Sequence, residues 1–183
     1  MWRSKHFWNQ DDLPFATPQE LAKSNKRVVL FADTFNAYFE NENLQAALSV
    51  LQKSEYIVHV ARPSSSTINP NPFCCGRTYL AAGMVDEAKS RLTALIGHLA
   101  PYAQQGIAIV GLEPSCLFTL RDEALQMNLG PRAELVSQQA QLLEEFLAKE
   151  HKANRFTPTL KESAKPILAV SYTHLTLPTK RIV

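Results

Sequence analysis

The stretch RVVLFAD, residues 27–33, decides the fold class of this chain. Five successive apolar residues, two of them β-branched, are typical of a strand that is covered on both faces. The run ends at Asp33, where the polar turn DTFN begins. We therefore expect a buried strand that delivers a polar turn to one edge of a sheet.

Two similar apolar runs follow, YIVHVAR at residues 56–62 and IAIVGL at residues 107–112. Apolar residues at helical spacing lie between and after them. These are Leu44, Ala47, Leu48 and Leu51; then Met84, Ala88, Leu92, Leu95 and Leu99, with Pro101 closing the helix; and finally Val136, Ala140, Leu143 and Leu147, which predict one last long helix. Alternating strands and helices predict an α/β fold, a three-layer arrangement with helices on both faces of a parallel sheet.

Composition limits the possible functions. The chain has 183 residues, 45% of them hydrophobic, and a formal charge of +2 without a long basic run, so we expect no nucleic-acid partner. Its apolar runs are far shorter than the ~20 residues of a membrane span, and its first residues do not form a secretory signal, so a cytoplasmic protein is expected. Three cysteines, an odd number, argue against a disulfide framework.

A distinctive turn follows each predicted strand. The turns are DTFN, CCGR and EPSC, beginning at Asp33, Cys74 and Glu113. Because ligands of parallel sheets bind beyond the carboxyl ends of the strands, Cys74, Cys75 and Cys116 are expected at one edge. Thiolates suit zinc and iron–sulfur clusters, and these three are candidate metal ligands. Buried structural cysteines or a vicinal disulfide are the alternatives.

Four neighbouring residues are candidate cofactor contacts. Gly76 would allow close backbone approach to a cluster or a positive φ angle. Arg77 would offset cluster charge or pair with a surface carboxylate, and Asp33 would polarise a ligand or cap a helix. Glu113 would be an oxygen ligand, a proton acceptor or an N-cap.

Three segments carry a resemblance to a known family. CCGRTYLAAG, GLEPSCLFTLRDE and LFADTFNAYFE occur in an order that resembles the cysteine-rich CCG domain of FAD-linked oxidases fused to an iron–sulfur region. Those proteins are of the D-lactate or D-2-hydroxyacid dehydrogenase type. The segment is also similar to the glycolate oxidase iron–sulfur subunit and the heterodisulfide reductase B subunit.

The resemblance implies a lone cysteine, then CCG, then CxxC, usually in two copies. Here Phe35 stands at the lone-cysteine position and Glu113 at the first position of CxxC. Cys74, Cys75 and Cys116 would therefore be only part of the ligand set of a [4Fe–4S] cluster, which commonly takes four thiolates. A second half of the domain would complete it.

The same resemblance implies the organisation of the chain. Residues 1–26 would be an irregular lead-in from a preceding domain, residues 27–150 the first CCG half, and residues 151–169 a linker and the start of the second half. Residues 170–183 begin with VSYTHLTLPT, which resembles a translated sequencing adapter, so we expect an artefact there, the alternative being an edge strand.

The implied function is that of a fragment of a larger enzyme. FAD in an absent upstream domain would oxidise a D-2-hydroxy acid such as D-lactate or glycolate, and ferredoxin-like clusters would carry the electrons. The CCG region would pass them to a quinone or a redox protein, in the cytoplasm or at the inner membrane face, and the fragment alone would be inactive. A metal-free docking module and a zinc site are the alternatives.

Overall fold

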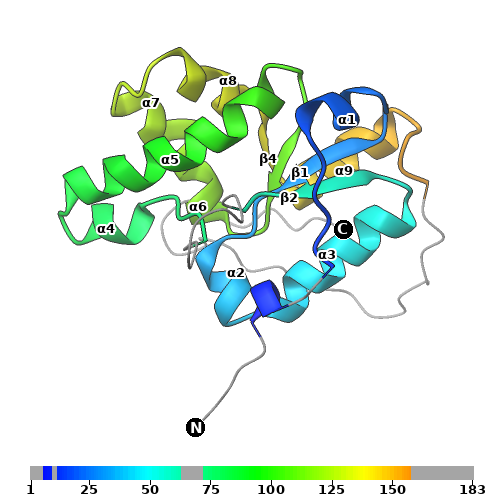
Figure 1. The fold of residues 1–183 in the computed structure, drawn as a ribbon, viewed down its shortest axis with the longest axis horizontal. Coiled ribbons are helices and arrows are strands. Elements are labelled where there is room, and N and C mark those ends of the chain that lie inside the picture. Colours follow the sequence, from blue (N-terminus) through cyan, green and yellow to red (C-terminus); the bar gives the residue numbers. More distant parts are fainter. Residues whose placement is uncertain (1–5, 10–11, 63–71, 158–183) are drawn as a thin grey trace, which may run out of the picture.

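The computed structural model describes residues 6–9, 12–62 and 72–157. Within them, four strands form one parallel sheet in the order β2-β1-β3-β4 (Figure 1). The strands are β1 (Arg27–Leu30), β2 (Ile57–Val60), β3 (Ile109–Gly111) and β4 (Ala140–Leu142). The α/β fold expected from the alternation of strands and helices is confirmed.

Helices connect the strands. They are α1 (Pro18–Ala22), α2 (Thr34–Tyr38), α3 (Asn41–Lys53), α4 (Arg77–Ala81), α5 (Val85–Ala103), α6 (Pro114–Phe118), α7 (Ala124–Gln126), α8 (Pro131–Gln139) and α9 (Leu143–Lys152), with a 3₁₀ turn at Phe7–Asn9 and a π-helical turn at Thr119–Glu123. In the described part of the chain, no helix combines the length and apolar character that crossing a bilayer requires.

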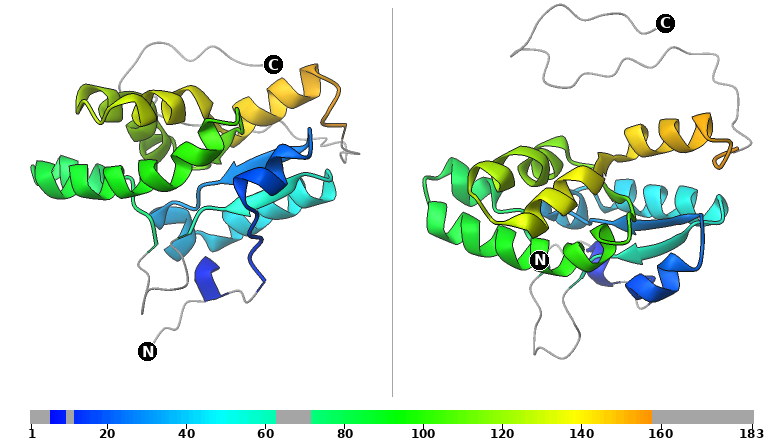
Figure 2. Two further views of the ribbon diagram at one scale, coloured as in Figure 1. Left: turned by 45° about the horizontal axis from the view of Figure 1, so that its top comes forward. Right: turned by 90° about the horizontal axis from the view of Figure 1, so that it is seen from above.

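Successive residues of β1 enter two different hydrophobic cores. Val29 packs with α5, α6 and α8, whereas Val28 and Leu30 pack with α3 and α9. Figures 1 and 2 show α5 and α8 on one side of the sheet and α3 on the other. Because side chains alternate along a strand, an unbroken apolar run lets the sheet bury both of its faces.

The lead-in segment contains regular structure and contributes to the core. Thr17 caps α1 in a reciprocal capping box with Glu20, and Leu21 and Phe7 are fully buried. Phe7 belongs to the core that Val28 and Leu30 enter, so this segment packs on the rest of the chain. At the other end, Phe156 is also buried, so the core extends past residue 150.

Two predicted helix boundaries were wrong. Pro101 does not end its helix but lies inside α5, close to its carboxyl end, where the helix continues to Ala103. The last long helix is interrupted, because Ala140–Leu142 form β4 between α8 and α9. The predictions for residues 158–169 and for the adapter-like tail lie outside the described residues.

The direction in which successive strands are added to the sheet reverses next to the predicted site. From β1 the chain proceeds to β2 on one side, and β3 lies on the other side. In doubly wound sheets this point of divergence opens a crevice beyond the carboxyl ends of the strands. The turns that begin at Asp33 and Glu113 flank that position.

Candidate functional site: a thiol cluster at the carboxyl edge of the sheet

The three cysteines meet at the carboxyl edge of the sheet, as the sequence predicts. Cys74 and Cys75 precede α4, and Cys116 lies in the first turn of α6, directly after β3. All three line one pocket of about 450 Å³, together with Thr34 and Phe35 from α2. Residues distant in sequence are therefore gathered around one space.

The thiols form a row of hydrogen bonds. Cys74 donates to Cys75, and Cys75 donates to Cys116. Backbone N–H groups also reach two of the sulfurs, from Gly76 to Cys74 Sγ and from Arg77 to Cys75 Sγ, each at 3.4 Å. We call Cys74, Cys75 and Cys116 the thiol cluster.

Two of the three thiols are buried, Cys74 is half-buried, and Cys74 and Cys75 hold their protons. Cys75 and Cys116 are each 3% exposed. The hydrogen bond to Cys116, followed by burial, raises the pKa of Cys75 to about 12. The pKa of Cys74 is also raised, first by its hydrogen bond to Cys75 and then by burial. Without a bound cation, these two thiols are therefore poor nucleophiles at neutral pH.

Gly76 adopts a backbone conformation that favours glycine. Its φ is +82°, and a Cβ at this position would lie 2.6 Å from the carbonyl oxygen of Ala88 in α5. Of the two roles that the sequence leaves open, the structure shows the positive φ, and it adds close packing of the CCG turn against α5.

Arg77 points to a surface partner. Its guanidinium forms an ion pair with Glu123 of the π-helical turn, and it does not line the thiol pocket. The structure therefore shows the surface-carboxylate alternative for Arg77, and compensation of cluster charge by this residue stays a prediction. The cation that lines the pocket is Arg91 of α5, which also pairs with Glu87.

Asp33 and Glu113 act as helix caps. Asp33 is 1% exposed and accepts hydrogen bonds from the backbone and side-chain amides of Asn36, at 3.0 and 2.8 Å. Burial, the largest cause, raises its pKa. Glu113 accepts from the backbone and hydroxyl of Ser115, at 3.2 and 2.6 Å. Neither carboxylate lines the thiol pocket, so the capping alternative describes both.

Three exposed aromatic side chains, which we call the rim, lie on or just after the helices that follow β1 and β3. Phe35 and Phe39, on and just after α2, are 46% and 78% exposed, and Phe118 at the end of α6 is 39% exposed. Of the three, Phe35 lines the pocket of the thiol cluster. Large exposed aromatic side chains are candidates for a contact surface.

Thiols are the type of ligand that an iron–sulfur cluster uses, but three are fewer than the four that it commonly takes. Three sulfurs face one pocket, which suits a soft metal or a cluster. However, they hydrogen-bond in a row, and among the described residues no group of three or more His, Cys, Asp or Glu side chains is arranged to hold a metal ion. In the described part of the chain, the three sulfurs therefore share a pocket but are not arranged as a metal site.

Comparisons with known proteins add no relative. No family model matches this chain, and neither the curated proteins nor the solved structures contain a match.

Sequence reasoning missed three contributors to the site, Thr34, Tyr79 and Arg91. Thr34 donates a hydrogen bond to Cys74, and Tyr79 lines the pocket with Arg91 above its ring at 5.7 Å. Thr34 lies in the quoted turn DTFN, so its position directly after a strand was the available signal. Nothing in the local sequence relates Arg91, sixteen residues beyond Cys75, to the thiols.

Proposed function

We propose that this chain is the CCG region of a FAD- and iron–sulfur-dependent oxidoreductase. In that protein a D-2-hydroxy acid such as D-lactate or glycolate is oxidised at FAD in another domain, and electrons leave through the CCG region to a quinone or a redox protein. The observation that carries the proposal is the convergence of Cys74, Cys75 and Cys116 on one pocket at the carboxyl edge of the sheet.

The burial and setting of the thiols support a ligand role. The three sulfurs are close enough for mutual hydrogen bonding, and backbone N–H groups already point at two of them. Hydrogen bonds of this kind stabilise sulfur that carries negative charge. Arg91 adds a cation at the pocket wall. When bound, a cluster would supply one-electron transfer, and this chain's residues would hold and orient it.

The missing ligand defines what a partner segment must provide. Phe35, at the expected lone-cysteine position, lines the pocket with an aromatic ring, and Glu113 is engaged with Ser115. The three thiols thus require a fourth ligand from outside the described residues. We propose that a second CCG half supplies it and that this chain alone has no dehydrogenase activity.

A docking module is the second candidate. It is favoured by the exposed rim of Phe35, Phe39 and Phe118 and by the protonated state of Cys74 and Cys75. In this case the thiols pack the turn in place, and the rim binds a domain of the same enzyme.

Metal analysis separates the candidates. The chain is incubated anaerobically with iron and sulfide, or with zinc, in the presence of 2-mercaptoethanol as a source of the fourth ligand, and is then desalted. Iron and acid-labile sulfide retained together, with visible absorption, support the cluster role. Retention of zinc in preference to iron indicates a zinc site. Retention of neither metal contradicts the ligand role and leaves the docking module.

A further inference from the structure

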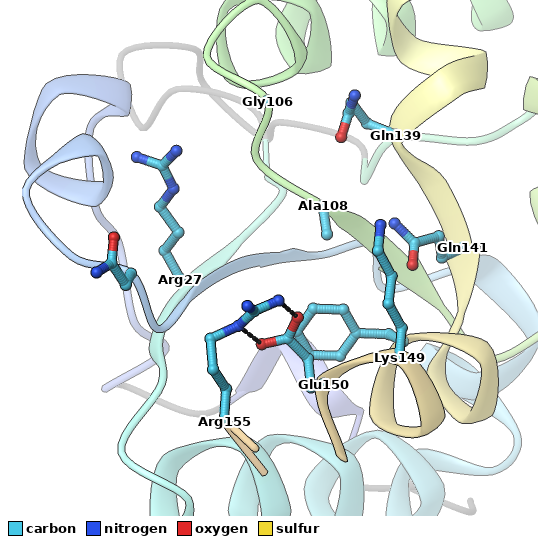
Figure 3. Close-up of a pocket in the computed structure, with 10 residues that line it drawn as sticks. Arg27, Gly106, Ala108, Gln139, Gln141, Lys149, Glu150 and Arg155 are labelled. Atoms are coloured by element: carbon cyan, nitrogen blue, oxygen red, sulfur yellow. Dashed lines mark hydrogen bonds and ion pairs between the residues drawn. The ribbon is translucent and has the colours of Figure 1, made fainter. Parts of the chain in front are cut away.

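A second pocket lies at the end of the sheet opposite to the thiol cluster. It has a volume of about 430 Å³. Arg27 is the first residue of β1, and Ala108 and Gln139 directly precede β3 and β4, so the amino ends of three strands form its floor. Helix α9 contributes Lys149 and Glu150, and Arg155 follows it (Figure 3). We call this space the amino-edge pocket.

The single carboxylate of this pocket is fully engaged. Glu150 is 6% exposed and receives two hydrogen bonds from Arg155, at 2.6 and 2.8 Å. Tyr56 donates a third, at 2.7 Å. Hydrogen bonding to Arg155 lowers the pKa of Glu150, so it stays ionised and neutralises Arg155. The hydrogen-bonding positions of Glu150 that the structure shows are therefore taken by Arg155 and Tyr56, and not by Arg27 or Lys149.

Two cations remain for a ligand. Arg27 gives one N–H to the carbonyl oxygen of Gln105 at 3.0 Å, which leaves most of its five donors. The side chain of Lys149 forms no hydrogen bond or ion pair within residues 6–9, 12–62 and 72–157, although its charge also acts on Glu150 at longer range. Figure 3 shows Arg27 and Lys149 on either side of the pocket, with the Glu150–Arg155 pair between them.

Amide side chains complete the lining. Gln139 and Gln141 face the same space, and in the described part of the chain neither side chain has a hydrogen-bond partner. Apolar contact comes from Ala108 and Phe146. A pocket with surplus positive charge and free amide donors suits a small polar anion, because charge-assisted hydrogen bonds to oxyanions are the strong ones.

We infer that the amino-edge pocket binds a small oxyanion, a carboxylate or phosphate compound, through Arg27, Lys149 and the two glutamine amides. The site is separate from the thiol cluster and does not depend on the proposed oxidoreductase role. Its position at the strand amino ends also separates it from the crevice where such sheets usually bind their ligands.

Calorimetric titration of the full chain tests this inference. Inorganic phosphate and succinate are the two probes, each titrated at an ionic strength held constant with chloride. We expect saturable binding of at least one of them, and the tighter probe identifies the ligand class. Lys149→Gln should weaken binding about tenfold, the equivalent of one charged hydrogen bond.

The matched control is Lys152→Gln, which makes the same charge change on the same helix but outside the pocket. It should leave the affinity unchanged. Absence of saturable binding by both probes overturns the inference. Equal weakening by the two variants also overturns it, because it would indicate diffuse surface charge rather than a pocket. A thermal melt of each variant verifies folding.

Discussion

At the residue scale, the sequence predicted where the three cysteines lie, but it left open the roles of the charged residues around them. The convergence of Cys74, Cys75 and Cys116 followed from their positions after strands, since parallel strands deliver such turns to one edge. The roles of Asp33, Arg77 and Glu113 did not follow, because each depends on a partner that only the fold supplies. Asn36 and Ser115 are local partners, but Glu123 lies 46 residues from Arg77.

Gly76 gives the sharpest single-residue prediction. Gly76→Ala combines a positive φ with a Cβ placed 2.6 Å from a backbone oxygen, whereas Gly83→Ala has φ +76° and no atom within 4 Å. Both substitutions incur the strain of a positive φ, about 1 kcal/mol. Only Gly76→Ala should lose a further 1 to 3 kcal/mol, roughly, from overpacking. Urea unfolding measures both, and equal losses would contradict the packing role.

At the element scale, strands and long helices were predictable but their ends were not. Val136, Ala140, Leu143 and Leu147 fit one helical stripe, yet Ala140 and Leu142 are buried as alternate residues of a three-residue strand. Pairing with β3 outweighs the helical spacing there. Pro101 lies so near the end of α5 that little helix remains for the missing N–H to disturb.

A histidine pair joins β2 to α5 and predicts a dependence of stability on pH. His59 is fully buried, accepts from the Ala16 N–H at 3.3 Å and lies 3.1 Å from His98, Nε2 to Nε2. Since Ala16 donates to Nδ1, the neutral His59 carries its proton on Nε2 and donates to His98. Burial, the largest cause, lowers the pKa of His59 to about 3 and also lowers that of His98.

The sign follows from proton uptake. The pKa of His59 is 6.5 in the unfolded chain, so below this pH the unfolded chain binds a proton that the folded chain does not bind. The contribution of His59 to the free energy of unfolding is therefore fully present above pH 6.5 and is lost as the pH falls toward 3. His59→Asn keeps an acceptor for Ala16 but removes one titrating group. Urea unfolding between pH 7 and pH 5 should show a shallower decline for the variant, by up to ~1.4 kcal/mol per pH unit. Parallel declines would contradict the assignment.

At the scale of the whole molecule, two hydrophobic cores and one long-range hydrogen bond hold the helices and strands together. The two faces of β1 bury separate cores, which the unbroken apolar run VVLFA predicts. The contact between Tyr56 and Glu150 spans 94 residues and joins the loop before β2 to α9. No local pattern identifies it, because a buried glutamate is recognised only once its partners are known.

Removal of the hydrogen bond between Tyr56 and Glu150 should lower the free energy of unfolding. Tyr56→Phe keeps the ring that packs on Phe146 at 5.4 Å but removes one donor from the buried Glu150. The expected loss is about 1 to 3 kcal/mol, since the carboxylate keeps only Arg155. Tyr79→Phe, which changes a tyrosine at the thiol pocket, is the control and should cost less. Thermal or urea unfolding compares them, and an equal or smaller loss for Tyr56→Phe would count against the contact.

The central claim is that the thiol cluster is a ligand set, and bound iron per chain tests it most directly. After anaerobic reconstitution with iron, sulfide and 2-mercaptoethanol, iron is measured for the unmodified chain, for Cys74→Ser, Cys75→Ser and Cys116→Ser, and for Thr78→Ser, a pocket residue without a thiol. The account predicts that each cysteine variant loses most of the bound iron while Thr78→Ser retains it. Iron content that is the same in all five proteins, or absent from the unmodified chain, would contradict it.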